Sequence, residues 1–190
     1  SNCPYGIVVD STNVYFITYL GANLGTVNKV NISGGSVTTL ASGLSNPKYI
    51  VVDSTNVYFT EYTGGTVKKV GINGGSVTAL AAGGNPQDIV VDSTNVYWTD
   101  YYGGLVKKVS INGGSVTALA SSLSYPSGIA VDSTNVYWTE ESGIVKKVSI
   151  NGGSVTTLAS GLSTPEAIAV DSTNVYWTEY SGGTVKKIAK

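Results

Sequence analysis

Apolar positions along the chain fall into short groups that are separated by clusters of Asp, Ser, Thr, Asn and Gly. In the stretch 126–164, residues 129–131 form an apolar run without alternation, which is typical of a strand buried on both faces. Residues 136–140 are rich in β-branched and aromatic side chains and favour a second strand. Further strands are expected at 145–150 and 154–158, so every local signal predicts strands and turns.

The connections between these strands also have recognisable signals. Asp-Ser-Thr-Asn predicts a tight turn after the first strand, because Asp accepts hydrogen bonds from the following amides and Asn tolerates a positive φ. Gly-rich links such as residues 62–65 reverse the chain after the second strand. Asn151-Gly152 is a strong hairpin signal between the third and fourth strands. The unit is therefore expected to be a four-stranded antiparallel meander whose hydrophobicity falls from the first strand to the last.

This unit repeats along the whole chain. The string Asp-Ser-Thr-Asn-Val-Tyr begins at Asp10, Asp53, Asp92, Asp132 and Asp171, and a proline opens each copy. A period of this length is the sequence signature of a repeat architecture. We interpret residues 1–190 as a single propeller domain with repeats at 4–46, 47–85, 86–125, 126–164 and, incompletely, 165–190.

The repeat restricts how the units can pack. Each predicted sheet has two apolar faces and cannot hide either of them alone, so the copies must stack face to face. Radial stacking with the most apolar strand innermost gives a β-propeller. A β-solenoid would need parallel strands, which the Asn-Gly hairpins exclude. The sequence therefore predicts an all-β fold, a β-propeller of five four-stranded antiparallel blades whose last blade lacks its outer strand.

The last repeat stops in or at the end of its third strand, and too few residues precede Pro4 to supply an outer strand. An unpaired edge recruits other strands unless it is protected. Three explanations remain open: a short final blade, a chain cut from a longer array, or a neighbouring chain that covers the edge in an oligomer or fibre. The absence of Met indicates a processed product or an excerpt. The expected assembly edge consists of Thr184, Val185, Lys186, Lys187 and Ile188.

Composition excludes several classes of function. The net charge of −1 and the absence of Arg argue against a nucleic-acid-binding protein. With no His and with Cys3 as the one Cys, His-based acid–base catalysis, a Cys–His nucleophile and His/Cys metal sites are excluded. No apolar run reaches the roughly 18 residues that a membrane helix needs. Abundant Ser, Thr, Asn, Gly and Tyr favour an extracellular or cell-surface location.

A family resemblance is carried by the second strand of each repeat. Residues 97–100 read Tyr-Trp-Thr-Asp, and residues 137–140 and 176–179 differ from this only by Glu in place of Asp. The chain thus resembles the YWTD repeat of lipoprotein-receptor propellers and is similar to the NHL group and to bacterial exported propellers. The resemblance implies the fold but no activity. Those relatives close with six blades, whereas this sequence holds five copies.

Three recurring features are expected to be structural. The Asp-Ser-Thr-Asn turns supply too few oxygens for a calcium site and are expected to be hydrogen-bonded turns. In each Lys-Lys pair only one lysine can face a given side of its strand, and solvated or inter-blade ion pairs with the acidic residues of the second strand are expected. Trp98, Trp138 and Trp177 are expected in the core between blades.

Candidate ligand-binding residues lie where the repeats differ or where tyrosines occur in links. The two residues after each proline vary between copies and are expected at the mouth of the central channel. Exposed link tyrosines beside Asn, Ser and Thr would suit stacking on sugar rings. The candidates are Tyr5, Lys48, Tyr49, Gln87, Asp88 and Glu166 at the channel mouth, with Tyr62, Tyr101, Tyr102 and Tyr180 on the rim.

The function that these observations favour is a non-enzymatic binding or structural propeller that self-assembles through its incomplete last blade. A glycan-binding propeller is the main alternative, so the expected partner is protein or glycan, and no cofactor is expected. The resemblance also leaves a metal-dependent, lactonase-like enzyme as a second alternative. Against it, only Asp88, Glu141 and Glu166 depart from the two acidic positions that recur in the repeat.

Overall fold

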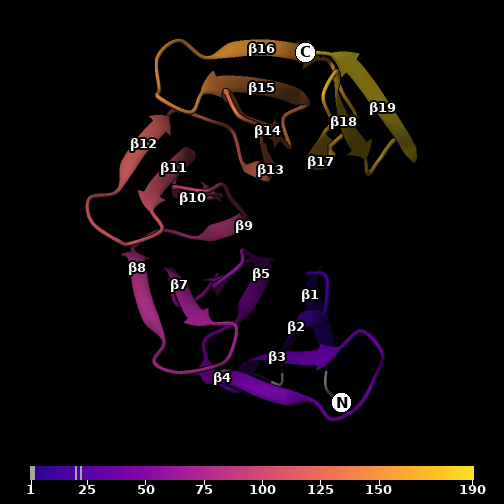
Figure 1. Ribbon diagram of the computed structural model, residues 1–190. Coiled ribbons are helices and arrows are strands. Elements are labelled where there is room, and N and C mark those ends of the chain that lie inside the picture. Colours follow the sequence, from indigo (N-terminus) through magenta and orange to yellow (C-terminus); the bar gives the residue numbers. More distant parts are fainter. Residues whose placement is uncertain (1–2, 20, 22) are drawn as a thin grey trace.

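The computed structural model describes residues 3–19, 21 and 23–190. The described residues form 19 strands and no helix, arranged in four four-stranded sheets and one three-stranded sheet, all antiparallel. The sheets surround a common axis like the blades of a propeller, and the ring is open between the first blade and the last (Figure 1). This confirms the predicted five-bladed propeller with an incomplete last blade.

The blades follow one another in chain order. Blade 1 is β1 (Cys3–Val9), β2 (Asn13–Tyr19), β3 (Gly25–Asn31) and β4 (Thr38–Leu44). Blade 2 is β5 (Pro47–Val52), β6 (Asn56–Glu61), β7 (Thr66–Gly71) and β8 (Thr78–Ala82). Blade 3 is β9 (Pro86–Val91), β10 (Asn95–Asp100), β11 (Leu105–Ser110) and β12 (Thr117–Ala120). Blade 4 is β13 (Pro126–Val131), β14 (Asn135–Glu140), β15 (Ile144–Ser149) and β16 (Thr156–Ser160), and blade 5 is β17 (Pro165–Val170), β18 (Asn174–Glu179) and β19 (Thr184–Ala189).

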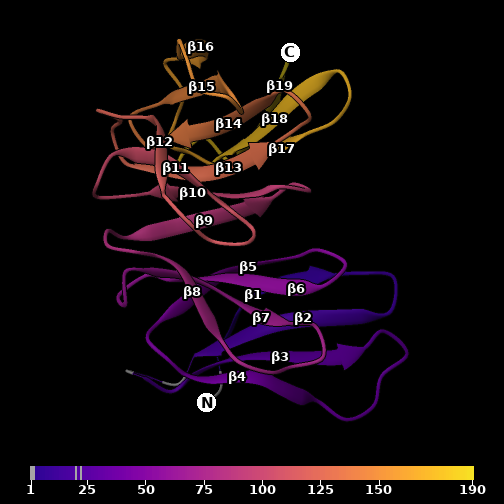
Figure 2. The same cartoon turned by 60° about the vertical axis from the view of Figure 1, so that its left-hand side comes forward.

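The first strand of each blade lies nearest the axis, as the apolar runs predicted. A channel of about 360 Å³ runs between these strands, and its walls are almost entirely Val, Ile and Ala. Figure 2 shows the blades from the side, with β9 and β5 facing each other near the middle of the molecule. The lining residues come from β1, β5, β9, β13 and β17 and include Val8, Val51, Val90, Ala130 and Ile168.

The Asp-Ser-Thr-Asn segments are hydrogen-bonded turns, as predicted. In blade 4, one carboxylate oxygen of Asp132 accepts the backbone N–H groups of Thr134 and Asn135, both at 2.8 Å. Its other oxygen accepts the hydroxyl of Tyr137 at 2.9 Å. The same set of bonds recurs at Asp10, Asp53, Asp92 and Asp171. Each turn therefore fixes the inner strand to the tyrosine that begins the YWTD motif.

The link between the third and fourth strands is longer than the predicted two-residue hairpin. The Ile150 N–H donates to the carbonyl of Thr134 at 2.9 Å, so the chain stays bonded to the first turn after β15 ends. The Gly152 N–H then donates to the carbonyl of Ser149 at 2.8 Å, and Gly152 and Gly153 have φ of 86° and 111°. The fourth strand consequently begins at Thr156, and the prediction of a strand from residue 154 was wrong at that end.

Adjacent blades pack through apolar faces. We call the face that contacts the following blade the leading face and the opposite one the trailing face. Between blades 3 and 4, Tyr97 and Val106 of the leading face pack against Ile129 and Trp138 of the trailing face, and all four are at most 2% exposed. Equivalent clusters fill the other three interfaces between consecutive blades. This confirms the inter-blade position expected for Trp98, Trp138 and Trp177.

Polar side chains of the leading face also bond to the next blade. The Thr99 hydroxyl donates to the carbonyl of Ser127 at 2.7 Å, and the ammonium of Lys108 donates to the carbonyl of Ile150 at 2.6 Å. Thr60, Thr139, Lys29 and Lys69 make the equivalent bonds at other interfaces. Since both acceptors are backbone carbonyls, these bonds do not depend on which side chain the next repeat carries.

The other lysine of each pair forms an ion pair, but within its own blade. Lys107 lies 2.7 Å from Asp100 and Lys146 lies 2.8 Å from Glu140, and each carboxylate side chain is 2% exposed. The expected partners, the acidic residues of the neighbouring second strand, are confirmed, but the expectation that these pairs would be solvated or between blades was wrong. The reason is the meander itself, because Lys107 lies opposite Trp98 on the neighbouring strand, within reach of the acid two residues further on. Lys68–Glu61 and Lys186–Glu179 complete the set.

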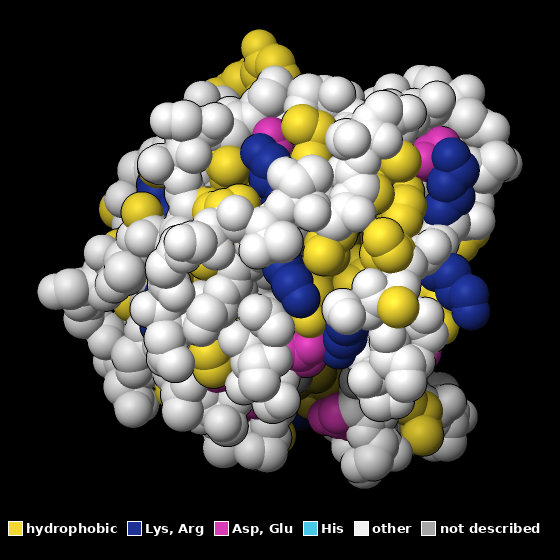
Figure 3. Space-filling view, turned by 90° about the horizontal axis from the view of Figure 1, so that it is seen from above, with side chains coloured by type: hydrophobic (Ala, Val, Ile, Leu, Met, Phe, Trp, Pro, Cys, Tyr) yellow, Lys and Arg dark blue, Asp and Glu magenta, His cyan; other side chains and the backbone are white. Residues whose placement is uncertain are grey.

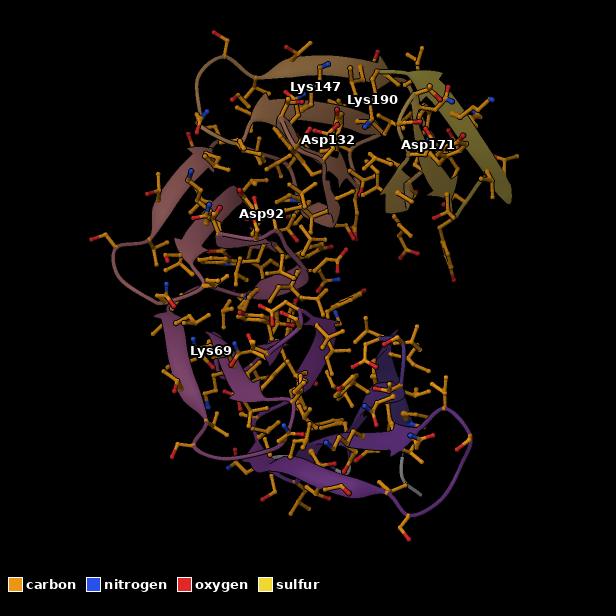
Figure 4. All side chains as sticks on the ribbon, in the orientation of Figure 1. Lys69, Asp92, Asp132, Lys147, Asp171 and Lys190 are labelled. Atoms are coloured by element: carbon orange, nitrogen blue, oxygen red, sulfur yellow. The ribbon has the colours of Figure 1, made fainter. Side chains whose placement is uncertain are left out.

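The fourth interface between consecutive blades has an additional ion pair. The ammonium of Lys190, which follows β19, lies 2.6 Å from the Asp132 carboxylate of blade 4, and Figure 4 shows the two side chains next to each other. The Lys190 N–H also donates to the carbonyl of Thr173 at 3.0 Å. Blade 5 is thus fixed to blade 4 by charge as well as by apolar packing.

The valine at the start of the third strand gives a direct test of blade packing. Val145 is 0% exposed between blades 4 and 5, whereas Val185 holds the same repeat position and is 73% exposed. We expect Val145→Ala to lower the free energy of unfolding by about 2 kcal/mol, because it removes buried methyl groups and leaves a cavity. Val185→Ala should change it by less than about 0.5 kcal/mol. Urea denaturation followed by tryptophan fluorescence measures both, and equal effects would contradict this account of the packing.

Candidate functional site

Four tyrosines gather on the rim of the propeller where the links between the second and third strands of the blades lie. We call Tyr62, Tyr101, Tyr102 and Tyr125 the tyrosine cluster. The rings of Tyr101 and Tyr102 meet edge to face, with centroids 5.0 Å apart and planes at 80°. Tyr125 lies 5.2 Å from Tyr101 and 6.3 Å from Tyr102, and Tyr62 lies 6.4 Å from Tyr102. The cluster therefore joins the links of blades 2 and 3 to the connection that enters blade 4.

Only part of the tyrosine cluster is exposed. Tyr102 is 66% exposed and Tyr125 is 49% exposed, while Tyr62 and Tyr101 are half-buried. The expectation that Tyr62 and Tyr101 would be exposed was wrong, because neighbouring rings and a lysine cover them. Beside the exposed rings lies a hollow of about 330 Å³, lined by Tyr101, Tyr102, Tyr125 and the backbone segment 122–124.

Tyr125 has an unusual backbone conformation. Its φ is 53°, in the left-handed region that bulky side chains rarely occupy. The same conformation occurs at two equivalent positions, Asn46 and Thr164, with φ of 54° and 53°, but not at Asn85. The carbonyl of Tyr125 accepts the N–H of Glu141 at 3.2 Å, which fixes the connection at the start of blade 4.

Charged groups flank the tyrosine cluster on two sides. The ammonium of Lys48 lies 4.4 Å from the centre of the Tyr62 ring and donates to the side-chain oxygen of Gln87 at 2.7 Å. The Tyr101 hydroxyl donates to the Glu141 carboxylate at 2.7 Å. Burial, together with Glu141, raises the pKa of Tyr101 above its usual range. Burial lowers the pKa of Lys48, against the attraction of Glu141 and Glu166.

The residues after the prolines meet at the channel mouth, where a small cavity of about 90 Å³ lies. Tyr49, Asp88, Ser127 and Glu166 are among its walls. The Asp88 carboxylate accepts the N–H of Ile129 in the next blade at 3.0 Å. It also accepts the N–H of Ile89 at 2.8 Å. Lys48 links this mouth to the tyrosine cluster, because it contacts Tyr62 and Gln87 together.

Burial raises the pKa of two groups at the channel mouth. It raises the pKa of the Asp88 carboxyl from 3.8 to about 6, although the two N–H donors act in the opposite direction. Burial also raises the pKa of Tyr49 to about 12, and the charges of Asp88 and Glu166 add to this shift. Asp88 thus links two blades and also titrates near neutral pH.

The remaining sequence candidates lie apart from this site. Tyr180 is 75% exposed on the link of blade 5, outside the tyrosine cluster. Tyr5 is 59% exposed on β1 and is not among the residues that line the cavity at the channel mouth. The proposed assembly edge is the strand β19, where residues 184–187 are exposed and Ile188 is partly buried. β19 pairs with β18 and has no outer neighbour in the described part of the chain.

Two residues of the site, Tyr125 and Glu141, were missed as binding candidates. The usable signal was the comparison of repeats. The residue before the proline is Cys3, Asn46, Asn85 and Thr164 in the other four copies, and tyrosine stands there only in the connection to blade 4. Glu141 likewise holds a link position that is tyrosine in blades 2, 3 and 5. Departures from the repeat therefore mark this part of the rim.

The described residues contain no group of three Asp, Glu or Cys side chains that could hold a metal ion. The part of the chain that the structure describes also contains no helix that could cross a membrane.

Lysine and acidic side chains lie beside one another on the face seen in Figure 3, with hydrophobic side chains visible between them. The rim around the tyrosine cluster offers a ligand mainly aromatic surface, with Lys48 and Glu141 beside it.

No family model matches the sequence, and no curated protein matches it. Solved structures do match. The chain is similar to a nidogen structure solved as a nidogen/laminin complex, with 22% identity over 98% of this chain and 75% of that chain and a TM-score of 0.82. A virginiamycin B lyase from Staphylococcus aureus matches at 15% identity over 98% and 84%, with a TM-score of 0.61. A streptogramin B lyase matches at 14% over 98% and 83%, with a TM-score of 0.60. These likenesses confirm a YWTD/NHL-like β-propeller fold.

The raised pKa of Asp88 predicts a pH dependence of stability. A carboxyl with a raised pKa binds its proton more tightly in the folded state, so its contribution is present below about pH 4 and is lost as the pH rises through about 6. Between pH 4 and 7 the free energy of unfolding of the wild type should therefore fall relative to Asp88→Asn, by about 2 kcal/mol. Urea titrations at each pH measure this difference. Gln87→Ala should keep the wild-type profile, and parallel profiles for wild type and Asp88→Asn would refute the assignment.

Proposed function

We propose that this protein is a non-enzymatic binding propeller that recognises a protein partner through the tyrosine cluster and the adjacent channel mouth. The observation that carries the proposal is the packing of four tyrosines from three connections into one partly exposed surface. Tyrosine is enriched in the buried centres of protein interfaces, where its ring adds contact area at a low entropic cost.

The ring geometry favours a protein partner over a glycan. Stacking on sugar requires an open ring face. Here the rings of Tyr101 and Tyr102 meet edge to face, and the Lys48 ammonium covers Tyr62. What remains exposed is the combined surface of Tyr102 and Tyr125 beside the hollow of about 330 Å³. A hollow next to exposed aromatic rings suits an inserted side chain of a partner, and Lys48 and Glu141 supply charges of both signs at its edge.

The identity of residue 125, rather than its conformation, supports a role in contact. A bulky residue in the left-handed region costs about 1 kcal/mol, and nothing in the fold requires tyrosine there, since Asn and Thr occupy the equivalent position. The side chain is 49% exposed, so it contributes little to the core and is available to a partner.

The comparisons agree with a binding role. The nidogen propeller, which has the higher TM-score, was solved in a complex with laminin, and a protein partner is proposed here by analogy of fold. The lyase structures match with lower TM-scores, and this chain has no His to act as a general base. An extracellular location, expected from composition, is part of the same proposal.

A peptide library displayed on phage and selected on the immobilised protein tests the proposal. We expect selection of related peptides, and we expect Tyr102→Ser and Tyr125→Asn each to weaken binding of the synthesised peptide at least tenfold, as interface hot spots do. Both variants introduce the type of residue found at equivalent positions, Ser181 and Asn46. Tyr125→Asn should also leave stability unchanged or raise it by about 1 kcal/mol. Surface plasmon resonance and urea denaturation give the two quantities.

Tyr180→Ser is the matched control, because Tyr180 is 75% exposed but lies outside the tyrosine cluster. Peptides that bind Tyr102→Ser and Tyr125→Asn as tightly as the wild type would place recognition elsewhere and refute the proposal. A glycan array run in parallel distinguishes the alternative. If a glycan binds and its binding requires Tyr102, the ligand of this site is a sugar and not a protein.

A further inference from the structure

Two exposed tyrosine rings stand almost at right angles beside the hollow on the rim. The planes of Tyr102 and Tyr125 make an angle of 86°, and their ring centres are 6.3 Å apart. Tyr101 and Tyr102 meet at a similar angle of 80°, but their centres are 5.0 Å apart, as in a direct edge-to-face contact. The wider spacing leaves a corner between Tyr102 and Tyr125, beside the hollow of about 330 Å³ that both rings line.

The spacing of these two rings suits a cation that contacts both. The tyrosine cluster already shows the distance at which an ammonium rests on one of its rings, because that of Lys48 lies 4.4 Å from the centre of the Tyr62 ring. A cation at this distance over each of two perpendicular rings forms a right-angled triangle with the ring centres, which are then about 6.2 Å apart. The 6.3 Å between Tyr102 and Tyr125 agrees with this arrangement.

Tyr101 adds a third aromatic wall. Its ring centre lies 5.0 Å from that of Tyr102 and 5.2 Å from that of Tyr125, and it lines the same hollow. Its hydroxyl donates to the Glu141 carboxylate at 2.7 Å, which fixes the ring. Several aromatic rings around one space are the arrangement that binds quaternary ammonium groups in proteins, and a carboxylate nearby adds an attractive charge.

The charges around the tyrosine cluster also favour a cation in the hollow. Burial raises the pKa of Tyr101 and of Tyr62, and the negative charge of Glu141 adds to both shifts, so its field reaches these rings. The ammonium of Lys48 is held over Tyr62 and by the side chain of Gln87. Neither Lys48 nor Tyr62 is among the described residues that line the hollow. A cation in the corner is therefore attracted by Glu141 and stays apart from the site of Lys48.

The walls favour a methylated ammonium over that of an ordinary lysine. A primary ammonium is strongly hydrated and has three donors that need acceptors when it leaves water. The carboxylate beside the hollow already accepts the hydroxyl of Tyr101, and ring faces do not replace the missing acceptors. A quaternary ammonium donates no hydrogen bond, and its methyl groups contact ring faces directly. Its compact head also fits a corner, whereas a sugar ring needs one flat open face.

We propose that the corner between Tyr102 and Tyr125 binds a quaternary ammonium group, with Tyr101 as the third wall and Glu141 as the balancing charge. The proposal rests on the proposed function, since it names the group that the protein partner inserts into the hollow: the head of a trimethylated lysine side chain. Choline carries the same head, and the experiment separates the two carriers. All four residues lie between β10 and β15, in the middle of the described chain.

Isothermal titration calorimetry of the full chain at constant ionic strength tests the proposal. The probes are acetyl-trimethyllysine amide, choline chloride and 3,3-dimethylbutan-1-ol, an uncharged alcohol with the shape of choline. We expect the two quaternary cations to bind at least tenfold more tightly than the alcohol, because the ring faces attract positive charge. Acetyl-lysine amide, which carries the primary ammonium, should bind more weakly than its trimethylated form.

Variants of the walls test the place of binding. Tyr102→Ser and Tyr125→Asn should each weaken the binding of the trimethylated probe at least tenfold, whereas Tyr125→Phe should retain it, because the ring face makes the contact. Glu141→Gln keeps an acceptor for Tyr101 but removes the charge, so it should weaken binding of the cations severalfold and leave that of the alcohol unchanged. Tyr180→Ser is the matched control, since Tyr180 is 75% exposed outside the tyrosine cluster, and it should bind as the wild type does.

Two side chains that are replaced, Tyr102 and Tyr125, are 66% and 49% exposed, so their variants should fold, and urea denaturation checks this. Equal affinity for choline and the uncharged alcohol would overturn the proposal, because the hollow would then recognise shape without charge. Binding that survives both Tyr102→Ser and Tyr125→Asn, or no binding of either quaternary probe, would also overturn it. If choline binds at least tenfold more tightly than the trimethylated lysine, the carrier is a choline compound and the proposed protein side chain is wrong.

Failure of this inference and failure of the proposed function are distinguishable. Selected peptides that require Tyr102, together with no binding of the quaternary probes, would leave the proposed function intact and refute the cation site. Binding of the probes that requires Tyr102, with no peptide selected, would retain the cation site and refute recognition of a peptide surface by the tyrosine cluster.

Discussion

The stacking of apolar sheet faces is the interaction on which this molecule depends. A single blade has a hydrophobic side chain on each face at nearly every second position, and the hydrogen bonds within it cannot hide those side chains from water. Neighbouring blades hide them, and buried rings such as Trp138 fill the space between sheets. The ion pair of Lys146 with Glu140 and the turn at Asp132 orient the strands, but they act inside one blade. Assembly of the ring therefore results from burial, and the polar bonds determine its register.

The fold could be predicted because the same strand and turn signals occur in all five copies of the repeat. The β-branched and aromatic residues at 136–140 and the apolar run at 129–131 indicated strands, and two apolar faces required radial stacking. The failures were local. The link after β15 is longer than the Asn-Gly signal predicted, because Ile150 remains bonded to Thr134 in a turn that is distant in sequence. Tertiary bonds of this kind do not appear in a local pattern.

The candidate site was less predictable for a related reason. Residues that follow four of the five prolines line one cavity at the channel mouth, and Asp88 and Glu166 are among them. The tyrosine cluster depends on how links from different blades approach each other, and Tyr125 joins it from a connection that was interpreted only as a linker. Chain order places such residues in neighbouring repeats but does not give the angle between their rings. Comparing equivalent positions across copies was the better guide.

The open ring has a consequence for how the molecule responds to thermal fluctuation. Within the described residues, blades 2, 3 and 4 each have two neighbours and blades 1 and 5 have one, so in this arc the outer sheets lose less contact energy when they detach. Partial unfolding should therefore begin at the two ends of the arc and move inward. The ion pair between Lys190 and Asp132 opposes this process at the carboxyl end, and the bond from Lys29 to the carbonyl of Ile72 opposes it at the amino end.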